Sequence, residues 1–293
     1  MSRSIGLIGV GLMGLGIALN LARKGQALAV LDHPGNQPLD ELRPFGVTVR
    51  PTPAALAADR EVVILCVTGS PQVEAVLSGP EGVLSRLRPG TVVVDCSTAV
   101  PESTERMARA VEAAGGRFVD APMTRTPKHA REGTLNLLVG GEAELVESLR
   151  PVLGCFAENV AHVGPVGAGH RMKLLHNFVS LGSVALIAEA AALAGRAGIA
   201  PEVLVEVLAR GGGGGVALER LAPYLKSGDA SGLTFFMANA AKDLRYYTTM
   251  AANAGAADTI AEAVAATYEE GVRRGGERAL VPELATLLAA PRG

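Results

Sequence analysis

Four side chains that could take part in acid–base chemistry or hold a substrate lie in a largely apolar stretch near the middle of the chain. They are His170, Lys173, His176 and Asn177. Lys173 and Asn177 are four residues apart, so a helix places them on one face. Apolar neighbours surround Lys173, and desolvation lowers the pKa of a lysine towards the range useful for a general base. The same spacing fits a surface lysine on an amphipathic helix, so the residue types alone leave both interpretations open.

A glycine pattern near the amino end, Gly9-x-Gly11-x-x-Gly14, offers a different kind of site. A short apolar run precedes it, an apolar-periodic segment follows it, and a second apolar run ends at Asp32. In a strand–turn–helix–strand unit of this kind, the glycines let backbone N–H groups approach a pyrophosphate, and the acid bonds ribose hydroxyls. The pattern therefore predicts a dinucleotide site. The alternative is a glycine-rich turn that holds nothing, with Asp32 as a turn residue.

Short apolar runs alternate with helical segments as far as residue 164, and runs 61–67 and 91–95 are clear predicted strands. This alternation predicts an α/β fold, with a Rossmann-type doubly wound parallel sheet. Ligands of such sheets bind beyond the carboxyl ends of the strands. Val67, Thr68 and Thr98 lie at or just past such ends. We therefore expect residues 1–163 to form a dinucleotide-binding domain.

Residues 164–293 are predicted to form an all-helical domain, because no convincing strand follows residue 164. One long helix is expected over Gly169–Ala197. Its apolar part, Phe178–Ala194, is shorter than the ~20 residues of a membrane span, so a buried central helix is expected and no transmembrane segment. The run Gly211–Gly215 must break helix, either as a flexible linker or as a place where the backbone approaches a ligand.

Composition restricts the classes of protein that remain. The chain has 293 residues, 48% of them hydrophobic and 19% charged, with a formal net charge of -2. Disorder is therefore not expected, and the charge gives no case for binding nucleic acid or an anionic membrane. The three cysteines, Cys66, Cys96 and Cys155, are widely spaced within or beside apolar runs. They predict reduced core residues of a cytoplasmic protein and no metal site. No signal peptide is expected in the first residues, because Met1–Arg3 is short and Ile5 already starts the first predicted strand.

Several ordered motifs together resemble the β-hydroxyacid dehydrogenase family, which includes 3-hydroxyisobutyrate dehydrogenase and tartronate semialdehyde reductase and is distantly related to 6-phosphogluconate dehydrogenase. The matching motifs, which cover nearly the whole chain, are Gly9–Gly14 with Asn20-Leu21, Asp95-Cys96-Ser97-Thr98, Asp120-Ala121-Pro122 through Gly133-Thr134-Leu135 to Gly140-Gly141, Gly167-Ala168-Gly169 with Lys173 and Asn177, and Lys242-Asp243-Leu244.

The resemblance implies a Rossmann domain and a helical domain that also builds a homodimer or homotetramer. Asp32, followed by no lysine or arginine in His33–Asn36, predicts NAD as the cofactor. The resemblance also implies Lys173 as the general acid/base and Asn177 as the residue that orients the substrate. It places Thr98 against the nicotinamide ribose and Lys242 near the nicotinamide. The expected cofactor-binding residues are Gly9, Gly11, Leu12, Met13, Gly14, Asp32, Val67, Thr68, Thr98 and Lys242.

One segment departs from the family pattern. After Asp120-Ala121-Pro122 the family usually carries a hydrophobic residue and then Ser-Gly-Gly, which binds the substrate carboxylate. This chain has Met123 followed by Thr124, Arg125 and Thr126. The Arg-Thr pair resembles the sulfolactaldehyde reductase branch, in which it grips a sulfonate, and Ser180 is a further expected donor. The alternative is that Arg125 is a surface arginine in a loop.

The sequence thus predicts an NAD-dependent oxidoreductase that interconverts a small anionic 3-hydroxy acid, or a sulfonate analogue, with its semialdehyde. Thr124, Arg125, Thr126 and Ser180 are the expected substrate-binding residues, with Lys173 and Asn177 as the catalytic pair. Three alternatives stay open at this point. They are a related imine or aldehyde reductase, an enzyme like 6-phosphogluconate dehydrogenase, and a non-catalytic dinucleotide-binding module.

Overall fold

The computed structural model describes residues 3–291 of the chain. The chain divides after Lys173 into two compact units, each with a buried apolar core of its own. The division falls within a 29-residue helix, α7 (Ala168–Arg196), and therefore lies later than residue 164, the predicted boundary. The reason is that the first turn of α7 is hydrogen-bonded to the first unit.

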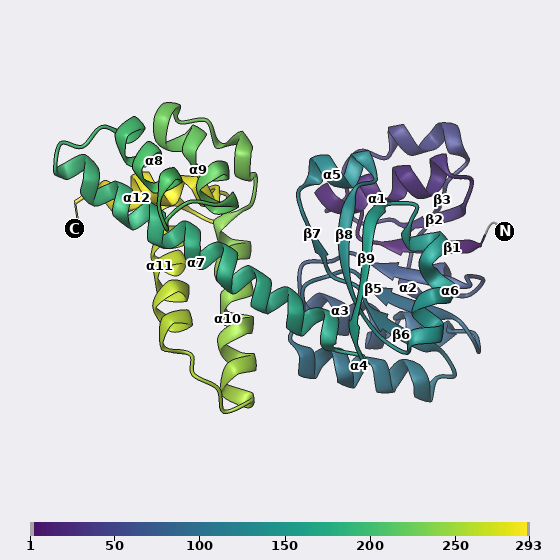
Figure 1. Cartoon of the computed structure of the whole chain (residues 1–293). Helices are drawn as coiled ribbons and strands as arrows, with labels where there is room; N and C mark the ends of the chain where they lie inside the picture. Colours follow the sequence, from purple (N-terminus) through teal and green to yellow (C-terminus); the bar gives the residue numbers. More distant parts are fainter. Residues whose placement is uncertain (1–2, 292–293) are drawn as a thin grey trace. The chain divides into compact units, whose positions relative to one another are not determined.

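The first unit is built on a nine-stranded sheet (Figure 1). The strands run in the order β3-β2-β1-β4-β5-β6-β8-β7, with β9 paired to β8. Their bounds are β1 (Ser4–Ile8), β2 (Ala27–Leu31), β3 (Thr48–Arg50), β4 (Val62–Leu65), β5 (Val92–Asp95), β6 (Arg117–Asp120), β7 (Met123–Thr124), β8 (Leu135–Gly140) and β9 (Ala157–Gly164). All four residues of β4 and of β5 are buried, as expected for central strands of a parallel sheet covered on both faces.

The predicted fold class is confirmed, with one difference at the far edge of the sheet. Strands β1 to β6 pair in parallel, but β8 runs antiparallel to β6 and to β7. The short strand β7 continues the line of β6 along β8, because only two residues separate β6 from β7. Strand β9 was not predicted, since its residues alternate without a clear apolar run.

Helices cover both faces of this sheet. Helices α1, α5 and α6 contribute to one apolar core, and α2, α3 and α4 contribute to the other. The bounds are α1 (Leu12–Arg23), α2 (Pro53–Ala57), α3 (Ser70–Ser78), α4 (Pro101–Ala113), α5 (Pro127–Glu132) and α6 (Ala143–Leu153), with 3-10 turns at Asp40–Phe45 and Val83–Arg86.

The described residues of the second unit form helices joined by turns and loops, with one isolated bridge between Phe236 and Leu280. Besides α7 it contains α8 (Pro201–Arg210), α9 (Val216–Ser227), α10 (Met237–Asn253), α11 (Thr259–Gly275) and α12 (Leu284–Ala289), with 3-10 turns at Ala230–Leu233 and Val281–Glu283. The run Gly211–Gly215 is the turn between α8 and α9. Helix α9 was missed from the sequence because it contains Pro223 and directly follows the glycine run.

Helix α7 is long and apolar enough to cross a membrane by length and composition alone, with a mean hydropathy of 1.8 over its most apolar window. Such a test is also met by the core helix of a globular protein. In this chain α7 contributes Leu181, Val184 and Ala188 to the core of the second unit.

The start of α7 is fixed by the carboxylate of Asp120, which lies at the end of β6 and is fully buried. Its Oδ1 accepts the N–H of Gly167 at 2.7 Å, and its Oδ2 accepts the N–H of His170 at 2.8 Å. These donors belong to the N-terminal end of the helix, where backbone N–H groups have no intrahelical acceptor. Space for this approach comes from Gly140 and Gly169, where an added Cβ would collide with Asp120 or its neighbours.

We predict that Asp120→Ala lowers the free energy of unfolding by on the order of 3 kcal/mol, because two buried N–H groups lose their acceptor. Asp120→Asn should lie in between, since its amide keeps one oxygen. Urea unfolding followed by circular dichroism measures the change. The control is Asp229→Ala, which removes an exposed acceptor of the Ser231 N–H and should cost much less. Equal losses in Asp120→Ala and Asp229→Ala would contradict this role of Asp120.

Candidate functional site: a dinucleotide turn and an anion loop

The glycine turn between β1 and α1 has the form that a dinucleotide requires. Gly9 has φ +97°, and an added Cβ would collide with the carbonyl group of Cys66. A Cβ on Gly14 would collide with the carbonyl oxygen of Gly9, whereas a Cβ on Gly11 would meet nothing within 4 Å. Gly11 therefore leaves an open space beside the first turn of α1, where N–H groups and the helix dipole favour phosphate.

Asp32 lies beyond the end of β2, and its side chain is exposed. Asn36 ties this end of β2 to the glycine turn. Its Oδ1 accepts the Val10 N–H at 3.2 Å, and its Nδ2 donates to the Leu31 carbonyl at 2.8 Å. A neighbouring carboxylate and an open glycine turn fit the ribose and the pyrophosphate of NAD.

The residues predicted after β4 and β5 are held by a relay of hydrogen bonds. The Val67 N–H donates to Ser97 Oγ at 3.0 Å, and the Ser97 N–H donates to the buried Asp95 carboxylate at 2.9 Å. Thr68 and Thr98, both predicted cofactor-binding residues, follow at this carboxyl edge of the sheet, with Thr68 exposed and Thr98 half-buried. The first unit thus collects every predicted cofactor residue except Lys242.

His170 is a structural residue, although its type and place made it a candidate for chemistry. Its side chain is fully buried, with Nε2 donating to the Ser97 carbonyl at 3.1 Å and Nδ1 2.8 Å from Thr104 Oγ1. It therefore joins α7 to the loop after β5 and to α4. Burial raises the pKa of Asp120, an effect opposed first by the positive charge available on His170 and then by the backbone N–H groups.

The predicted substrate loop, Thr124 to Thr126, runs from the last residue of β7 to the residue before α5. Thr124 is buried and its Oγ1 accepts from Asn136 Nδ2 at 3.3 Å, which leaves the hydroxyl proton for another acceptor. Arg125 has φ +80° and is the single non-glycine residue with positive φ among residues 3–291. Thr126 Oγ1 lies 2.8 Å from His129 Nδ1.

Lys173 and Asn177 lie one turn apart on α7, as predicted, with Lys173 half-buried and Asn177 buried. Asn177 Nδ2 donates to Asp243 Oδ2 of α10 at 2.7 Å. The Asp243 carboxylate also pairs with Lys242 Nζ at 2.9 Å, and this ammonium lies 5.0 Å from the centre of the Tyr246 ring. Within the second unit, Asp243 therefore fixes the two predicted site residues Asn177 and Lys242. Ser180, half-buried, follows on α7.

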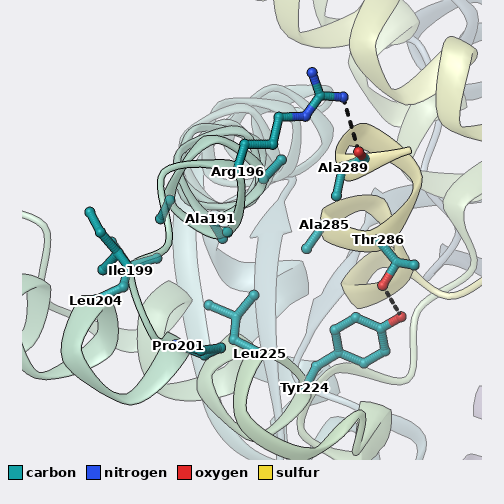
Figure 2. A pocket seen from close by; sticks show the side chains of 13 residues that line it. Ala191, Arg196, Ile199, Pro201, Leu204, Tyr224, Leu225, Ala285, Thr286 and Ala289 are labelled. Carbon is teal, nitrogen blue, oxygen red and sulfur yellow. Dashed lines mark hydrogen bonds between the residues drawn. The ribbon is translucent and has the colours of Figure 1, made fainter. Parts of the chain in front are cut away.

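A cavity of about 340 Å³ lies in the second unit, between the C-terminal end of α7 and helices α8, α9 and α12. Figure 2 shows the side chains that line it. Its walls are mostly apolar, and its polar groups already bond to protein atoms. Arg196 Nη2 donates to the Ala289 carbonyl at 3.0 Å, and Tyr224 Oη lies 2.9 Å from Thr286 Oγ1. Along α7 it begins roughly 27 Å beyond Lys173, so it is not the candidate catalytic site.

The cysteines give no sign of nucleophilic chemistry. Burial raises the pKa of the Cys66 thiol to about 12, and burial also raises the pKa of Cys96 and Cys155. These thiols stay protonated at neutral pH, and all three cysteines are free. Within residues 3–291 no three His, Cys, Asp or Glu side chains gather as a metal site would require.

These features define the class of nicotinamide-dependent oxidoreductases. They are a Rossmann unit with an open glycine turn, an acid after its second strand, and a lysine on helix α7, which follows the sheet. Comparison with known proteins agrees. Residues 4–164 match the model of the NAD-binding domain of 6-phosphogluconate dehydrogenase, and residues 167–288 match that of the NAD-binding domain of NADP-dependent 3-hydroxyisobutyrate dehydrogenase.

Relatives of assigned activity show the same relationship. The chain is 36% identical to 3-sulfolactaldehyde reductase of Escherichia coli over 70% of this chain and 68% of that one. It is 34% identical to 2-(hydroxymethyl)glutarate dehydrogenase of Eubacterium barkeri, over 71% and 69% respectively. The structure of 3-hydroxyisobutyrate dehydrogenase of Mycobacterium tuberculosis with L-serine matches with a TM-score of 0.88 and 26% identity, over 99% of this chain and 100% of that one.

The chain therefore belongs to the β-hydroxyacid dehydrogenase family, the NAD(P)-dependent 3-hydroxyisobutyrate dehydrogenases and related semialdehyde and sulfolactaldehyde reductases. It is an oxidoreductase of hydroxyl or aldehyde groups with NAD as its cofactor. Imine reductases also match, at 18–20% identity, and that likeness concerns the fold alone.

Four supporting residues could not be assigned from the sequence: Asn36, Asn136, Glu158 and Asp243. Glu158, Asn136 and Asp243 bond to Arg125, Thr124 and Asn177, which the sequence did identify. Asn36 bonds to Val10 in the glycine turn and to Leu31 beside Asp32. Of these four residues, only Asp243 could have been identified from the sequence, because it belongs to the family motif Lys242-Asp243-Leu244.

We predict that alanine at Gly11 impairs NADH binding, whereas alanine at Gly14 impairs the stability of the fold. Gly11→Ala should leave stability unchanged and weaken NADH binding about tenfold or more, about 1.4 kcal/mol, since its methyl group enters the space for the pyrophosphate. Gly14→Ala should destabilise the fold by about 1–3 kcal/mol through the collision with Gly9. Fluorescence titration of NADH and urea unfolding measure the two effects.

The control for these variants is Gly195→Ala, another open glycine, on the distant part of α7. It should lower neither the affinity for NADH nor the stability of the fold. Normal NADH affinity in Gly11→Ala would show that the pyrophosphate does not approach this turn.

Proposed function

We propose that this chain reduces a small three- or four-carbon semialdehyde that carries a carboxylate or sulfonate, or oxidises the corresponding 3-hydroxy acid, with NAD. The observation that carries the proposal is the loop Thr124-Arg125-Thr126, in which an arginine occupies a position that the family usually gives to glycine. An arginine offers a planar fork of donors for two oxygens of a carboxylate or sulfonate. The relationship to 3-sulfolactaldehyde reductase supports this substrate class.

The residues of the chain divide the work between binding and proton transfer. Bound NADH supplies the hydride. Lys173, as its ammonium, gives a proton to the carbonyl oxygen during reduction and takes the hydroxyl proton back during oxidation. Arg125, Thr124 and Thr126 hold the anionic end of the substrate, while Asn177 and Ser180 orient it from the following turns of α7. Lys242 is assigned to the nicotinamide end of the cofactor.

We also propose that the protein is a cytoplasmic homodimer or homotetramer, assembled through the helical unit. Val179, Leu186 and Leu193 are 66–68% exposed and repeat every seven residues along α7. Val203 and Val207 of α8 are exposed as well. A seven-residue repeat of exposed apolar side chains forms one stripe along a helix, as in helices that pack against a partner.

The first test of this function is Lys173→Ala, assayed with 3-hydroxyisobutyrate, tartronate semialdehyde and 3-sulfolactaldehyde as a substrate panel. Loss of the general acid/base should lower kcat for the best substrate by ~10²–10⁴-fold. NADH should still bind with near-normal affinity. NADH absorbance and fluorescence give the two readouts.

Lys128→Ala is the matched control, because it removes an exposed lysine of the same unit and should leave kcat unchanged. If Lys173→Ala keeps more than about a tenth of the wild-type kcat, another group moves the proton. If no member of the panel is turned over by the wild type, the substrate class is wrong.

A second test concerns cofactor selectivity at Asp32. The segment His33-Pro34-Gly35-Asn36 offers no cation for a 2′-phosphate, and a carboxylate repels that phosphate while accepting ribose hydroxyls. We predict that kcat/KM for NADH exceeds that for NADPH by at least about tenfold, and that Asp32→Ser narrows the ratio. A wild-type preference for NADPH would show that Asp32 does not bind the ribose.

A further inference from the structure

Arg125 is held by one nitrogen of its guanidinium. Nη1 donates both to the carbonyl oxygen of Thr134 and to Oε2 of Glu158, the latter at 2.5 Å. These two acceptors use both N–H groups of Nη1. Within residues 3–291, neither Nε nor Nη2 of Arg125 donates to a protein atom. The Nε–Nη2 edge is the side of a guanidinium that can bind two oxygens of one anion.

Glu158 reaches Arg125 because β9 is irregular at that residue. Leu135 of β8 lies opposite Ala157 and Asn136 lies opposite Asn159, so Glu158 is the extra residue of a β-bulge. Neighbouring residues of a regular strand point to opposite faces, and a bulge re-aims a side chain. Here both Glu158 and Asn159 serve the substrate loop.

Asn159 is connected to the same loop through two hydrogen bonds in series. Its Nδ2 donates to Asn136 Oδ1 at 2.8 Å, and Asn136 Nδ2 donates to Thr124 Oγ1 at 3.3 Å. At the bulge, Glu158 therefore contacts Arg125, and the next residue, Asn159, is linked to Thr124 through Asn136. Two adjacent residues of β9 fix two adjacent residues of the loop.

We propose that Glu158 is a positioning residue for substrate recognition. It holds Arg125 by Nη1 so that the Nε–Nη2 edge receives two oxygens of the substrate carboxylate or sulfonate. This inference rests on the proposed function, in which Arg125 binds the anionic end of the substrate.

The negative charge of Glu158 repels an anionic substrate. This repulsion must be compared with the benefit of holding Arg125 in position. The Glu158 side chain is 55% exposed, and it contacts the Nη1 end of the guanidinium. Solvent and salt screen its repulsion of an anion bound at the Nε–Nη2 edge. An arginine released from this contact gains rotamer freedom that substrate binding must remove again. Positioning therefore outweighs repulsion.

The experiment measures KM and kcat of Glu158→Ala and Glu158→Gln with 3-sulfolactaldehyde, or with the member of the substrate panel that the wild type turns over fastest. Glu158→Ala should raise KM about fivefold, the cost of ordering one long side chain, with little change in kcat. Glu158→Gln should stay within about twofold of the wild type, because its oxygen still accepts from Nη1. Arg125→Ala should raise KM about ten- to hundredfold.

Two controls separate positioning from other effects. Glu142→Ala breaks a comparable exposed ion pair with Arg117, 2.6 Å in length, beyond the opposite end of β8 and so about 20 Å away. It should leave KM unchanged. In an Arg125→Ala background, Glu158→Ala should have no further effect on KM, because the residue it positions is gone.

The outcomes distinguish this inference from the function on which it rests. An unchanged KM in Arg125→Ala overturns both. A raised KM in Arg125→Ala beside an unchanged or lowered KM in Glu158→Ala overturns the inference alone. So does a further rise in KM from Glu158→Ala in the Arg125→Ala background, and so does a loss of thermal stability in Glu158→Ala without a change in KM.

Discussion

The bonds of the buried Asp120 carboxylate to the start of α7 are the interaction on which the site depends most. Burying a carboxylate is unfavourable unless its charge and lone pairs are satisfied. Two backbone N–H groups bond to the lone pairs of this carboxylate, and the His170 ring lies 3.7 Å away. Because the accepted N–H groups belong to the first residues of α7, the carboxylate fixes where that helix begins. Lys173 lies one turn after His170, and its place follows from this anchor.

The same device recurs at two other places. Asp95 is fully buried and orders the loop after β5 through Ser97, and Asp243 is nearly buried and orders Asn177 and Lys242 in the second unit. In each case an aspartate that is withdrawn from solvent holds residues that are expected to meet the cofactor or the substrate. Preorganisation of this kind keeps side chains in place before a ligand arrives.

The fold and the cofactor turn could be predicted because their signals are local. A short run of consecutive residues is enough to predict the glycine turn, each apolar strand and the long apolar helix. Contacts such as Arg125–Glu158 depend instead on a β-bulge in β9 where this strand pairs with β8. A bulge adds one residue to a strand, and the hydrophobic pattern of the sequence does not reveal it. His170 shows the complementary difficulty, since a residue type suited to chemistry serves here to join three segments of the fold. Helix α9 was hidden by Pro223, which sequence rules treat as a helix breaker.

The left-handed backbone of Arg125 has a consequence for protein engineering. A residue with a side chain in this conformation costs about 1 kcal/mol relative to glycine, so a consensus or stability-guided library would favour the substitution Arg125→Gly. Such a variant would be free of the backbone strain, but it would lose the bonds of Arg125 to Thr134 and Glu158 together with the cation of the substrate loop. Selection on backbone conformation and selection for turnover would therefore favour different residues at this one position, and a descendant chosen without an activity screen would be expected to lose its substrate preference.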